Sequence, residues 1–374
     1  MRASISSGRR LCLPDGGYPT SPEACGSGRN HCVPVGRQYA NLMNAAVLVG
    51  VKQPLVIQQR PDPVAAAGQA VVRLKGAALN HRDLWTQLGL YPNIIVPITL
   101  GSDGAGVVTS VGSPADAAWV GREVIINPSL DWGDDPRAQG PHFRILGLPD
   151  PGTFAEQVVI PVANLAPKPA HLSWAESAAL PLAGLTAWRA LFTRAQLKAG
   201  ERVLVTGVGG GAALFALQFA VAAGAQVWVT SGSPEKIARA ITLGALGGVN
   251  YREAGWADSL PKLAGRFDVI VDSAGGEGFA KLIDLTAPGG RIVFFGATTG
   301  NPKGLDLRKC FFRQINVLGT TMGSPADFAG MIRLVGEKKI APVVDRVFPL
   351  ASAEAALRHL EAGAQFGKVG LALS

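Results

Sequence analysis

The stretch Val203-Leu-Val-Thr-Gly207-Val-Gly209-Gly210-Gly211-Ala212 decides the fold, because an apolar run enters closely spaced glycines and continues into an alanine-rich helix pattern over 213–223. The first glycine permits a tight turn, the second lets the backbone approach a pyrophosphate, and a small residue such as Ala212 lets the helix pack on the strand. The helix N-terminus then offers free N–H groups and a positive dipole end to an anion. These residues predict a dinucleotide-binding site, formed by Gly207, Gly209, Gly210, Gly211 and Ala212. The alternative is a tight structural turn in an α/β domain that binds something else.

The sequence around this stretch alternates between strand-like and helix-like segments, as in an α/β domain. From about Pro169 onward, apolar strand-like runs alternate with segments of helix length. The strand-like runs lie at 202–206, 226–230, 268–272 and 291–295. Such alternation is typical of a parallel, doubly wound sheet of Rossmann type.

The preceding part of the chain has a different pattern. Between Met43 and about Pro167, short β-runs are separated by glycine and proline, which predicts a mostly antiparallel, barrel-like β domain. A short helix over 353–362 and a last strand over 368–372 are expected to return to this domain. We therefore divide the chain into a disordered N-terminal extension (1–42), the first part of the barrel domain (43–167), a Rossmann domain (168–318) and a return to the barrel domain (319–374).

The first 42 residues are rich in Gly, Pro, Ser and Arg and have no sustained period of 2 or 3.6. We expect most of this segment to be disordered. A transit peptide is one alternative, since Arg and Ser are frequent, and translation from Met43 is another. The folded part is expected to begin with a strand over 45–49.

Composition limits the class of protein. The 374 residues are 48% apolar and 17% charged, which is typical of globular proteins, and no apolar run reaches the ~18 residues of a membrane span. The net charge of +8 is not gathered into basic blocks with aromatic residues, so nucleic acid is not the expected partner. Three of the four cysteines lie in the extension and Cys310 stands alone, so a reducing cytoplasm is the expected location.

The end of the strand after the glycines selects the cofactor. NAD sites usually place an acidic residue ~20 positions beyond the glycines, where it holds the ribose 2′-hydroxyl. This chain has Ser231, Gly232 and Ser233 there, followed by Lys236. A 2′-phosphate against Ser231, Ser233 and Lys236 predicts NADPH. The alternative is a helix that begins at Ser233 and Pro234 and leaves Lys236 in solvent.

Together these features resemble the medium-chain dehydrogenase/reductase superfamily, and within it the zinc-free NADPH:quinone oxidoreductase branch. The resemblance rests on short landmarks in a specific order: Asn80-His-Arg-Asp83, Gly89-Leu-Tyr91-Pro92, Gly101-Ser-Asp-Gly-Ala-Gly106, Gly152-Thr-Phe-Ala-Glu156, Leu185-Thr-Ala-Trp188, Gly319-Thr-Thr-Met322-Gly323 and Gly367-Lys368. It implies a GroES-like catalytic domain, built from both ends of the chain, with the Rossmann domain between. It also implies a nicotinamide in the cleft between domains, and a homodimer.

The resemblance assigns further cofactor residues. It places the 2′-phosphate on Lys236 and on the nearby Tyr251. The segment Phe294-Phe-Gly296-Ala297 is expected at a strand end beside the nicotinamide, where backbone groups hold the carboxamide. Met322 and Lys368 complete the predicted cofactor set.

Departures from the zinc pattern of the superfamily predict a site without metal. Asn80 stands where zinc members have Cys, and Ser102-Asp103 stands where they have a His–Glu pair. Amide and hydroxyl groups bind zinc poorly. The segment 127–150, which would carry four structural cysteines, has none. His81 and His142 remain as possible ligands, but an isolated histidine is more often structural.

Without a metal to stabilise an alkoxide, oxidation of a simple alcohol is poorly supported. Reduction of a quinone or an α,β-unsaturated carbonyl is easier, because hydride addition leaves a delocalised anion that a few hydrogen-bond donors can stabilise. Asn80, Tyr91 and Thr186 are the predicted donors, and Tyr91 or water would deliver the proton. Each also has a structural alternative, as a helix cap, a turn residue or a group bonded to helix backbone. The sequence thus predicts an NADPH-dependent reductase of a small-molecule acceptor. A zinc-type alcohol dehydrogenase and a non-catalytic NADPH-binding or sensor protein are the alternatives.

Overall fold

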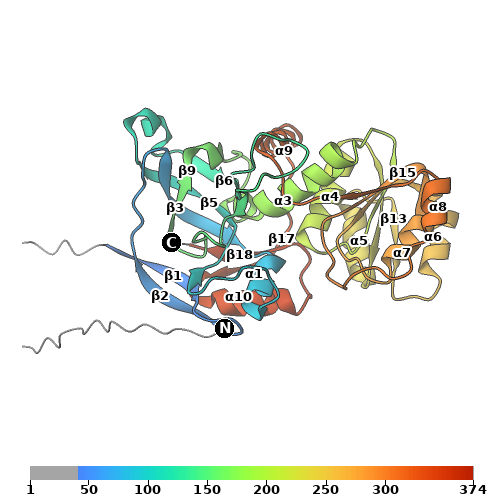
Figure 1. The fold of residues 1–374 in the computed structure, drawn as a ribbon, viewed down its shortest axis with the longest axis horizontal. Helices are drawn as coiled ribbons and strands as arrows, with labels where there is room; N and C mark the ends of the chain where they lie inside the picture. The colour runs from blue at the N-terminus through green and yellow to red at the C-terminus, as the bar shows by residue number, and fades with distance from the viewer. Residues whose placement is uncertain (1–40, 374) are drawn as a thin grey trace, which may run out of the picture. The chain divides into compact units, whose positions relative to one another are not determined.

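The computed structural model describes residues 41–373 (Figure 1). The expectation for the extension over 1–42 lies outside the described residues except at Asn41 and Leu42. Leu42 already begins the first strand, β1 (Leu42–Leu48), three residues before the predicted start. An antiparallel pairing with β2 (Leu55–Pro61) explains the earlier start, because Leu42 pairs with Pro61 at the far end of that register.

The glycine motif lies in a six-stranded parallel sheet, as predicted. The strand order is β13-β12-β11-β14-β15-β16, with every neighbouring pair parallel. The bounds are β11 (Arg202–Val205), β12 (Gln226–Ser231), β13 (Gly247–Asn250), β14 (Phe267–Asp272), β15 (Thr286–Phe294) and β16 (Asn316–Gly319). The order reverses direction at β11, so the turn after β11 opens at the switch point where ligands bind in such sheets.

Helices connect the strands of this sheet, and their apolar side chains pack against it to form the hydrophobic core. They are α4 (Gly211–Ala222), α5 (Pro234–Thr242), α6 (Trp256–Ala264), α7 (Phe279–Leu285) and α8 (Leu307–Phe312). The helices α2 (Trp174–Ala179) and α3 (Pro181–Trp188) and the π-helical turn Arg189–Arg194 lead into the sheet. Helix α4 is apolar on nearly all sides and is buried, which matches its position against the sheet.

The second sheet forms the predicted barrel-like domain. Its strand order is β10-β6-β5-β3-β18-β17, and β9 also pairs with β3. These strands are β3 (Gln69–Ala78), β5 (Asp103–Val111), β6 (Glu123–Ile126), β9 (Gln157–Pro161), β10 (Leu165–Pro167), β17 (Val344–Pro349) and β18 (Lys368–Ala372). Smaller pairings are β2-β1-β4, with β4 at Ile98–Thr99, and β7-β8, at Ser129–Leu130 and Arg144–Ile145.

Short helical segments complete this domain. They are α1 (His81–Leu88), α10 (Ala353–Glu361) and the 3₁₀ turns Pro114–Trp119, Val162–Asn164 and Leu350–Ser352. The last strand, β18, pairs antiparallel with β3, so the end of the chain does return to the first domain (Figure 1). Helix α9 (Pro325–Lys338) buries Phe328, Met331 and Val335 in the same core as α3 and α4, and the chain reaches the barrel sheet only with β17.

These two sheets confirm the predicted fold class, a Rossmann sheet with a GroES-like β domain. The predicted strands agree with the observed ones to within a few residues at their ends, where hydrogen bonding rather than apolar pattern sets the boundary. Among residues 41–373, no helix has both the length and the apolar character needed to cross a membrane.

The close approach of β3 and β5 requires a glycine. A Cβ placed on Gly106 would lie 2.1 Å from the carbonyl oxygen of Arg73, on the paired strand. This contact is with backbone, so a side chain can be accommodated only if a strand moves. Gly106 is therefore a packing residue of the barrel sheet.

We predict that Gly106→Ala lowers stability by about 1–3 kcal/mol or more, the usual range for forcing an extra methyl group into a packed core. Gly336→Ala is the matched control, because a Cβ at Gly336 of α9 meets no atom within 4 Å and alanine favours a helix. Thermal melting of the two variants measures the difference. A Gly106→Ala protein as stable as the control would contradict the predicted clash.

Candidate functional site

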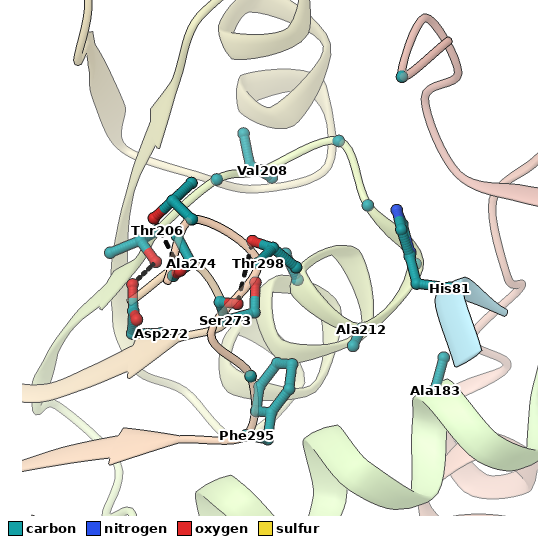
Figure 2. A pocket seen from close by; sticks show the side chains of 18 of the residues that line it. His81, Ala183, Thr206, Val208, Ala212, Asp272, Ser273, Ala274, Phe295 and Thr298 are labelled. Carbon is teal, nitrogen blue, oxygen red and sulfur yellow. Dashed lines mark hydrogen bonds between the residues drawn. The ribbon is translucent and has the colours of Figure 1, made fainter. Parts of the chain in front are cut away.

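A cavity of about 1170 Å³ lies between the glycine turn and the first turn of α1. Figure 2 shows Thr206 and Asp272 on one wall and His81 on the opposite wall. Of the sixteen predicted site residues, the cavity is lined by Asn80, Tyr91, Thr186, Gly207, Gly209, Gly210, Gly211, Ala212, Ser231, Ser233, Lys236, Tyr251, Gly296, Met322 and Lys368. Ala297 is the one predicted residue that does not line it.

The glycine turn is held as a backbone cradle. Gly207 and Gly209 have φ values of +63° and +133°, which favour glycine. The amide of Val208 donates to the Thr230 carbonyl at 2.7 Å, and the amide of Gly367 donates to the Gly209 carbonyl at 2.9 Å. A Cβ on Gly211 would lie 2.6 Å from the Lys368 side chain. At Gly209 and Gly211 the Lys236 and Lys368 side chains therefore occupy the space that a Cβ would need.

Helix α4 begins directly behind this cradle. Its N-cap is Gly210, and no side chain caps the helix amides there. The first turn therefore points unpaired N–H groups and the positive dipole end toward the cavity. A narrow cradle of glycines with free amides fits the pyrophosphate of a dinucleotide.

The strand end that selects the cofactor carries hydroxyls and cations. Ser231 donates its hydroxyl to the Val208 carbonyl at 3.0 Å, and Ser233 caps α5 by accepting from the Lys236 amide at 3.2 Å. The Lys236 ammonium donates to the Gly363 carbonyl at 2.8 Å and has two further N–H groups. Burial lowers the pKa of Lys236, Asp345 raises it, and Arg239 and Arg252 lower it further. An anion placed here would stabilise the charged ammonium.

Sequence reasoning missed Arg252. A Cβ on Gly232 would lie 2.8 Å from both the Tyr251 hydroxyl and the Arg252 Nε, so both side chains reach the turn after β12. Arg252 also lines the cavity. An arginine directly after the predicted Tyr251, at the end of the next apolar strand, was the signal that could have identified it.

Asp272 is a second residue that sequence reasoning missed. It accepts the Thr206 hydroxyl at 2.5 Å and the Gly275 amide at 2.8 Å, and so joins the end of β14 to the end of β11 (Figure 2). Burial raises the pKa of Asp272. The residue shapes the wall beside the glycine turn. Its position at the end of a buried parallel strand was the available signal.

Beyond β15, Gly296 lines the cavity and Ala297 packs away from it. A Cβ on Gly275 would lie 3.1 Å from the Ala297 Cα, which places Ala297 against the loop after β14. Met322 is buried, with a positive φ of 42°, and lines the cavity next to Thr321.

Asn80 and Lys368 belong to one buried hydrogen-bond network. The Lys368 ammonium donates to the Leu79 carbonyl, the Asn80 Oδ1 and the Asp103 Oδ2 at 2.7, 2.7 and 2.8 Å. The Asn80 amide nitrogen donates to the same Asp103 oxygen at 2.9 Å. Both ends of the Asn80 amide and all three ammonium protons of Lys368 are thus engaged within the protein. Asn80 is also the N-cap residue of α1, and its backbone N–H donates to the Asp83 carboxylate at 2.7 Å, so its structural alternative as a helix cap stands beside this network.

Tyr91 and Thr186 differ in what their hydroxyls do. The Thr186 hydroxyl donates to the Leu182 carbonyl at 2.8 Å, within α3, so it keeps only acceptor capacity toward the cavity. Tyr91 is half-buried, and the hydrogen bonds among residues 41–373 include none for its hydroxyl. Of the three predicted donors, Tyr91 is the one with a free O–H at the cavity.

The side chains at the expected metal positions are bonded to cations. Ser102 accepts from Arg82 Nη1 at 2.7 Å and donates to the Leu146 carbonyl at 2.6 Å, while Asn80 accepts from Lys368. Within residues 41–373, no group of three or more His, Cys, Asp or Glu side chains is arranged to hold a metal. Burial raises the pKa of the neighbouring Asp83 to about 6, although Arg82 acts in the opposite direction.

Two family models match the chain. The model described as "Alcohol dehydrogenase GroES-like domain" matches residues 66–170, and the model described as "Zinc-binding dehydrogenase" matches residues 211–337. The first falls within the barrel domain up to the segment before α2, and the second begins at the start of α4.

Curated relatives cover most of the chain. A zinc-type alcohol dehydrogenase-like protein of Leptosphaeria maculans is 34% identical over 343 residues, which are 85% of this chain and 94% of the relative. An acryloyl-coenzyme A reductase of Metallosphaera sedula is 30% identical over 340 residues, covering 87% and 99%. A quinone oxidoreductase of Pseudomonas aeruginosa is 30% identical over 325 residues, covering 83% and 93%.

Solved structures share the fold. An NAD-dependent alcohol dehydrogenase has 40% identity and a TM-score of 0.82, covering 89% of this chain and 100% of its own. A 2-octenoyl-CoA carboxylase reductase in complex with NADP and 2-octenoyl-CoA has 25% identity and a TM-score of 0.81, covering 89% and 88%. These matches confirm the superfamily that the motifs indicated. The chain belongs to the medium-chain dehydrogenase/reductase superfamily, a group of nicotinamide-dependent oxidoreductases.

Proposed function

We propose that the protein is an NADPH-dependent reductase that transfers hydride to a quinone or an α,β-unsaturated carbonyl without a metal. The observation that carries this proposal is the pairing of Asn80 with Lys368 and of Ser102 with Arg82. A metal ion needs free lone pairs and negative ligands, and here both positions face protonated side chains instead. The names of the acryloyl-coenzyme A reductase and quinone oxidoreductase relatives support the same substrate class.

The zinc-type alcohol dehydrogenase remains the second candidate, because one relative at 34% identity carries the words "zinc-type alcohol dehydrogenase-like" in its name. That chemistry requires a Lewis acid to stabilise an alkoxide. The donor set at Asn80 and Ser102 argues against it. Metal content and substrate range distinguish the two candidates.

NADPH is the proposed cofactor because the end of β12 carries Ser231, Gly232 and Ser233 in place of an acidic residue. Lys236 and Arg252 add two cations around this turn. A 2′-phosphate suits this environment, whereas a 2′-hydroxyl would leave the cations unpaired. Glu235 in the first turn of α5 is held by the Ser233 hydroxyl at 2.5 Å, away from a role as ribose acceptor.

The residues of the cavity support hydride transfer by binding and orientation. The glycine cradle and the first turn of α4 would hold the pyrophosphate, and the loops after β14 and β15 would surround the nicotinamide. When bound, NADPH supplies a hydride to the electron-poor carbon of the acceptor. The acceptor then carries negative charge on oxygen and takes up one proton. Tyr91 has the free hydroxyl that can hydrogen-bond this oxygen and deliver the proton, with water as its source thereafter.

We predict that Lys236→Ala weakens NADPH binding about tenfold or more and leaves NADH binding nearly unchanged, since one charge-assisted hydrogen bond contributes roughly 1.5–3 kcal/mol. Arg252→Ala is expected to act in the same direction. Lys338→Ala, at the exposed end of α9, is the matched control and should change neither affinity. Fluorescence titration with both cofactors measures the effect. Equal losses for NADPH and NADH would show that Lys236 does not contact the 2′-phosphate.

We predict that the purified protein contains no stoichiometric zinc and that NADPH reduces quinones or 2-alkenals, with alcohols nearly inert in reverse. Tyr91→Phe is expected to lower kcat up to ~100-fold, as loss of one oxyanion donor does, with little change in NADPH affinity. Elemental analysis and a panel of acceptors provide the measurements. One zinc per chain would favour the alcohol dehydrogenase, and inactivity toward every acceptor would favour a cofactor-binding protein.

We also propose that the protein forms a homodimer through α8 and β16. Leu307, Phe311 and Phe312 of α8 are 67%, 70% and 84% exposed, and Val317 of the edge strand β16 is 38% exposed. Apolar side chains beside an open strand edge are typical of an interface. A two-fold axis would let two such edges pair with each other.

Phe311→Glu with Phe312→Glu is expected to convert the dimer to a monomer, because two charges would enter an apolar contact. Leu263→Glu, on the exposed face of α6 at 60% exposure, is the control. Light scattering after size-exclusion chromatography reports the mass. A dimer that persists in the double variant would place the interface elsewhere.

A further inference from the structure

We infer that Arg82 supplies the positive charge of an oxyanion subsite and acts on the bound acceptor through Tyr91. The inference rests on the proposed reductase function and names a positioning residue for it. Arg82 lies in the first turn of α1, lines the cavity and is 7% exposed. A buried guanidinium is costly unless something compensates its charge.

No carboxylate forms an ion pair with Arg82, although the adjacent buried Asp83 interacts with it electrostatically. The ion pairs among residues 41–373 do not include Arg82, and its hydrogen bonds go to neutral groups. Nη1 donates to the Ser102 hydroxyl at 2.7 Å and to the Leu146 carbonyl at 2.9 Å, while the buried Nε has no partner. The neighbouring Asp83 spends its two carboxylate oxygens on the amides of Asn80 and Gly101.

The other cation at this end of the cavity differs in this respect. The Lys368 ammonium is neutralised by Asp103 at 2.8 Å and uses its three protons inside the protein. Arg82 is therefore the cation on this side that has no ion pair among residues 41–373. Ionisable groups in strongly perturbing surroundings cluster at functional sites.

Tyr91 connects this charge to the cavity. The Arg82 Cζ lies 5.0 Å from the centre of the Tyr91 ring, in a cation–π contact. The contact fixes the ring, and the Tyr91 hydroxyl is left free to bond a ligand. A positive charge behind the ring stabilises negative charge that develops at or beside the phenol oxygen, and the low dielectric of the site strengthens this effect.

This arrangement gives Tyr91 and Arg82 separate roles as negative charge forms on the acceptor during reduction. The acceptor receives two electrons with the hydride, its oxygen becomes negative, and Tyr91 donates a hydrogen bond or its proton to that oxygen. Arg82 keeps its own proton throughout and compensates the negative charge. It performs electrostatically what a metal would perform by coordination.

A binding experiment tests the subsite without turnover. 4-Nitrophenol is the probe, because its anion absorbs at longer wavelength than the neutral phenol. In the presence of NADP⁺, the wild type is expected to bind the anionic form at a pH where the free probe is mostly neutral. Arg82→Gln is expected to bind the neutral form or to lose about tenfold or more in affinity for the anion, as for loss of one charge-assisted contact. Equal anion binding in both proteins would overturn the inference.

Kinetics with a quinone and a 2-alkenal test the coupling to Tyr91. Arg82→Gln is expected to lower kcat about 10–100-fold and to change NADPH affinity less than twofold. The double variant Arg82→Gln with Tyr91→Phe should be no slower than Tyr91→Phe alone, because the two residues act as one functional unit and their effects are not additive. Additive losses would overturn the action through Tyr91. An inactive wild type that still binds the probe anion through Arg82 would remove the reductase proposal and leave the oxyanion subsite.

One further variant separates charge from packing. Arg82→Lys keeps a cation, loses the forked geometry, and should fall between wild type and Arg82→Gln in kcat. If Arg82→Gln does not fold, Arg82→Lys alone and with Tyr91→Phe carries the same comparison.

Discussion

The carboxylate of Asp103 is the interaction on which the rest of the structure depends. It is fully buried on β5, and its two oxygens reach the ammonium of Lys368 on β18 at 2.8 Å, the amide of Asn80 at 2.9 Å and the backbone N–H of Leu182 at 2.7 Å. These partners come from the last strand of the chain, from the start of α1 and from the first turn of α3. One charge thus joins both ends of the barrel domain to the helix that leads into the Rossmann sheet.

This carboxylate holds together Asn80, Leu182 and Lys368, which all line the cavity. Leu182 is the second residue of α3, so its amide is one of the helix N–H groups without a partner inside the helix, and a carboxylate is the favoured acceptor there. Breaking a buried ion pair of this kind typically costs 3–5 kcal/mol, because the remaining charge stays buried. The contacts of Asp103 therefore link the barrel strands to α3 at this edge of the cavity.

The same region places two organic cations beside Asn80 and Ser102. Asn80 accepts a hydrogen bond from Lys368, and Ser102 accepts one from Arg82. The oxygen lone pairs that a metal would need are therefore used by protonated side chains. Lys368 forms an ion pair with Asp103, whereas Arg82 donates to a hydroxyl and a carbonyl and has no ion pair among residues 41–373. In the proposed subsite, Arg82 is the cation available to a ligand.

The sequence by itself determined the two sheets, the glycine cradle and the absence of an acid after β12, because each depends on residues close together in the chain. Apolar runs, glycines and a helix start are local features, so they can be recognised from neighbouring residues without knowledge of the tertiary structure. The tertiary structure alone decided which side chains meet. Asp272 is bonded by Thr206, 66 residues earlier in the chain, and Arg82 donates to Leu146, 64 residues later. The amide of Asn80 is used by Lys368, 288 residues later in the chain. No local pattern encodes such contacts. The bond between Asn80 and Lys368, for example, requires the last strand of the chain to pair with β3.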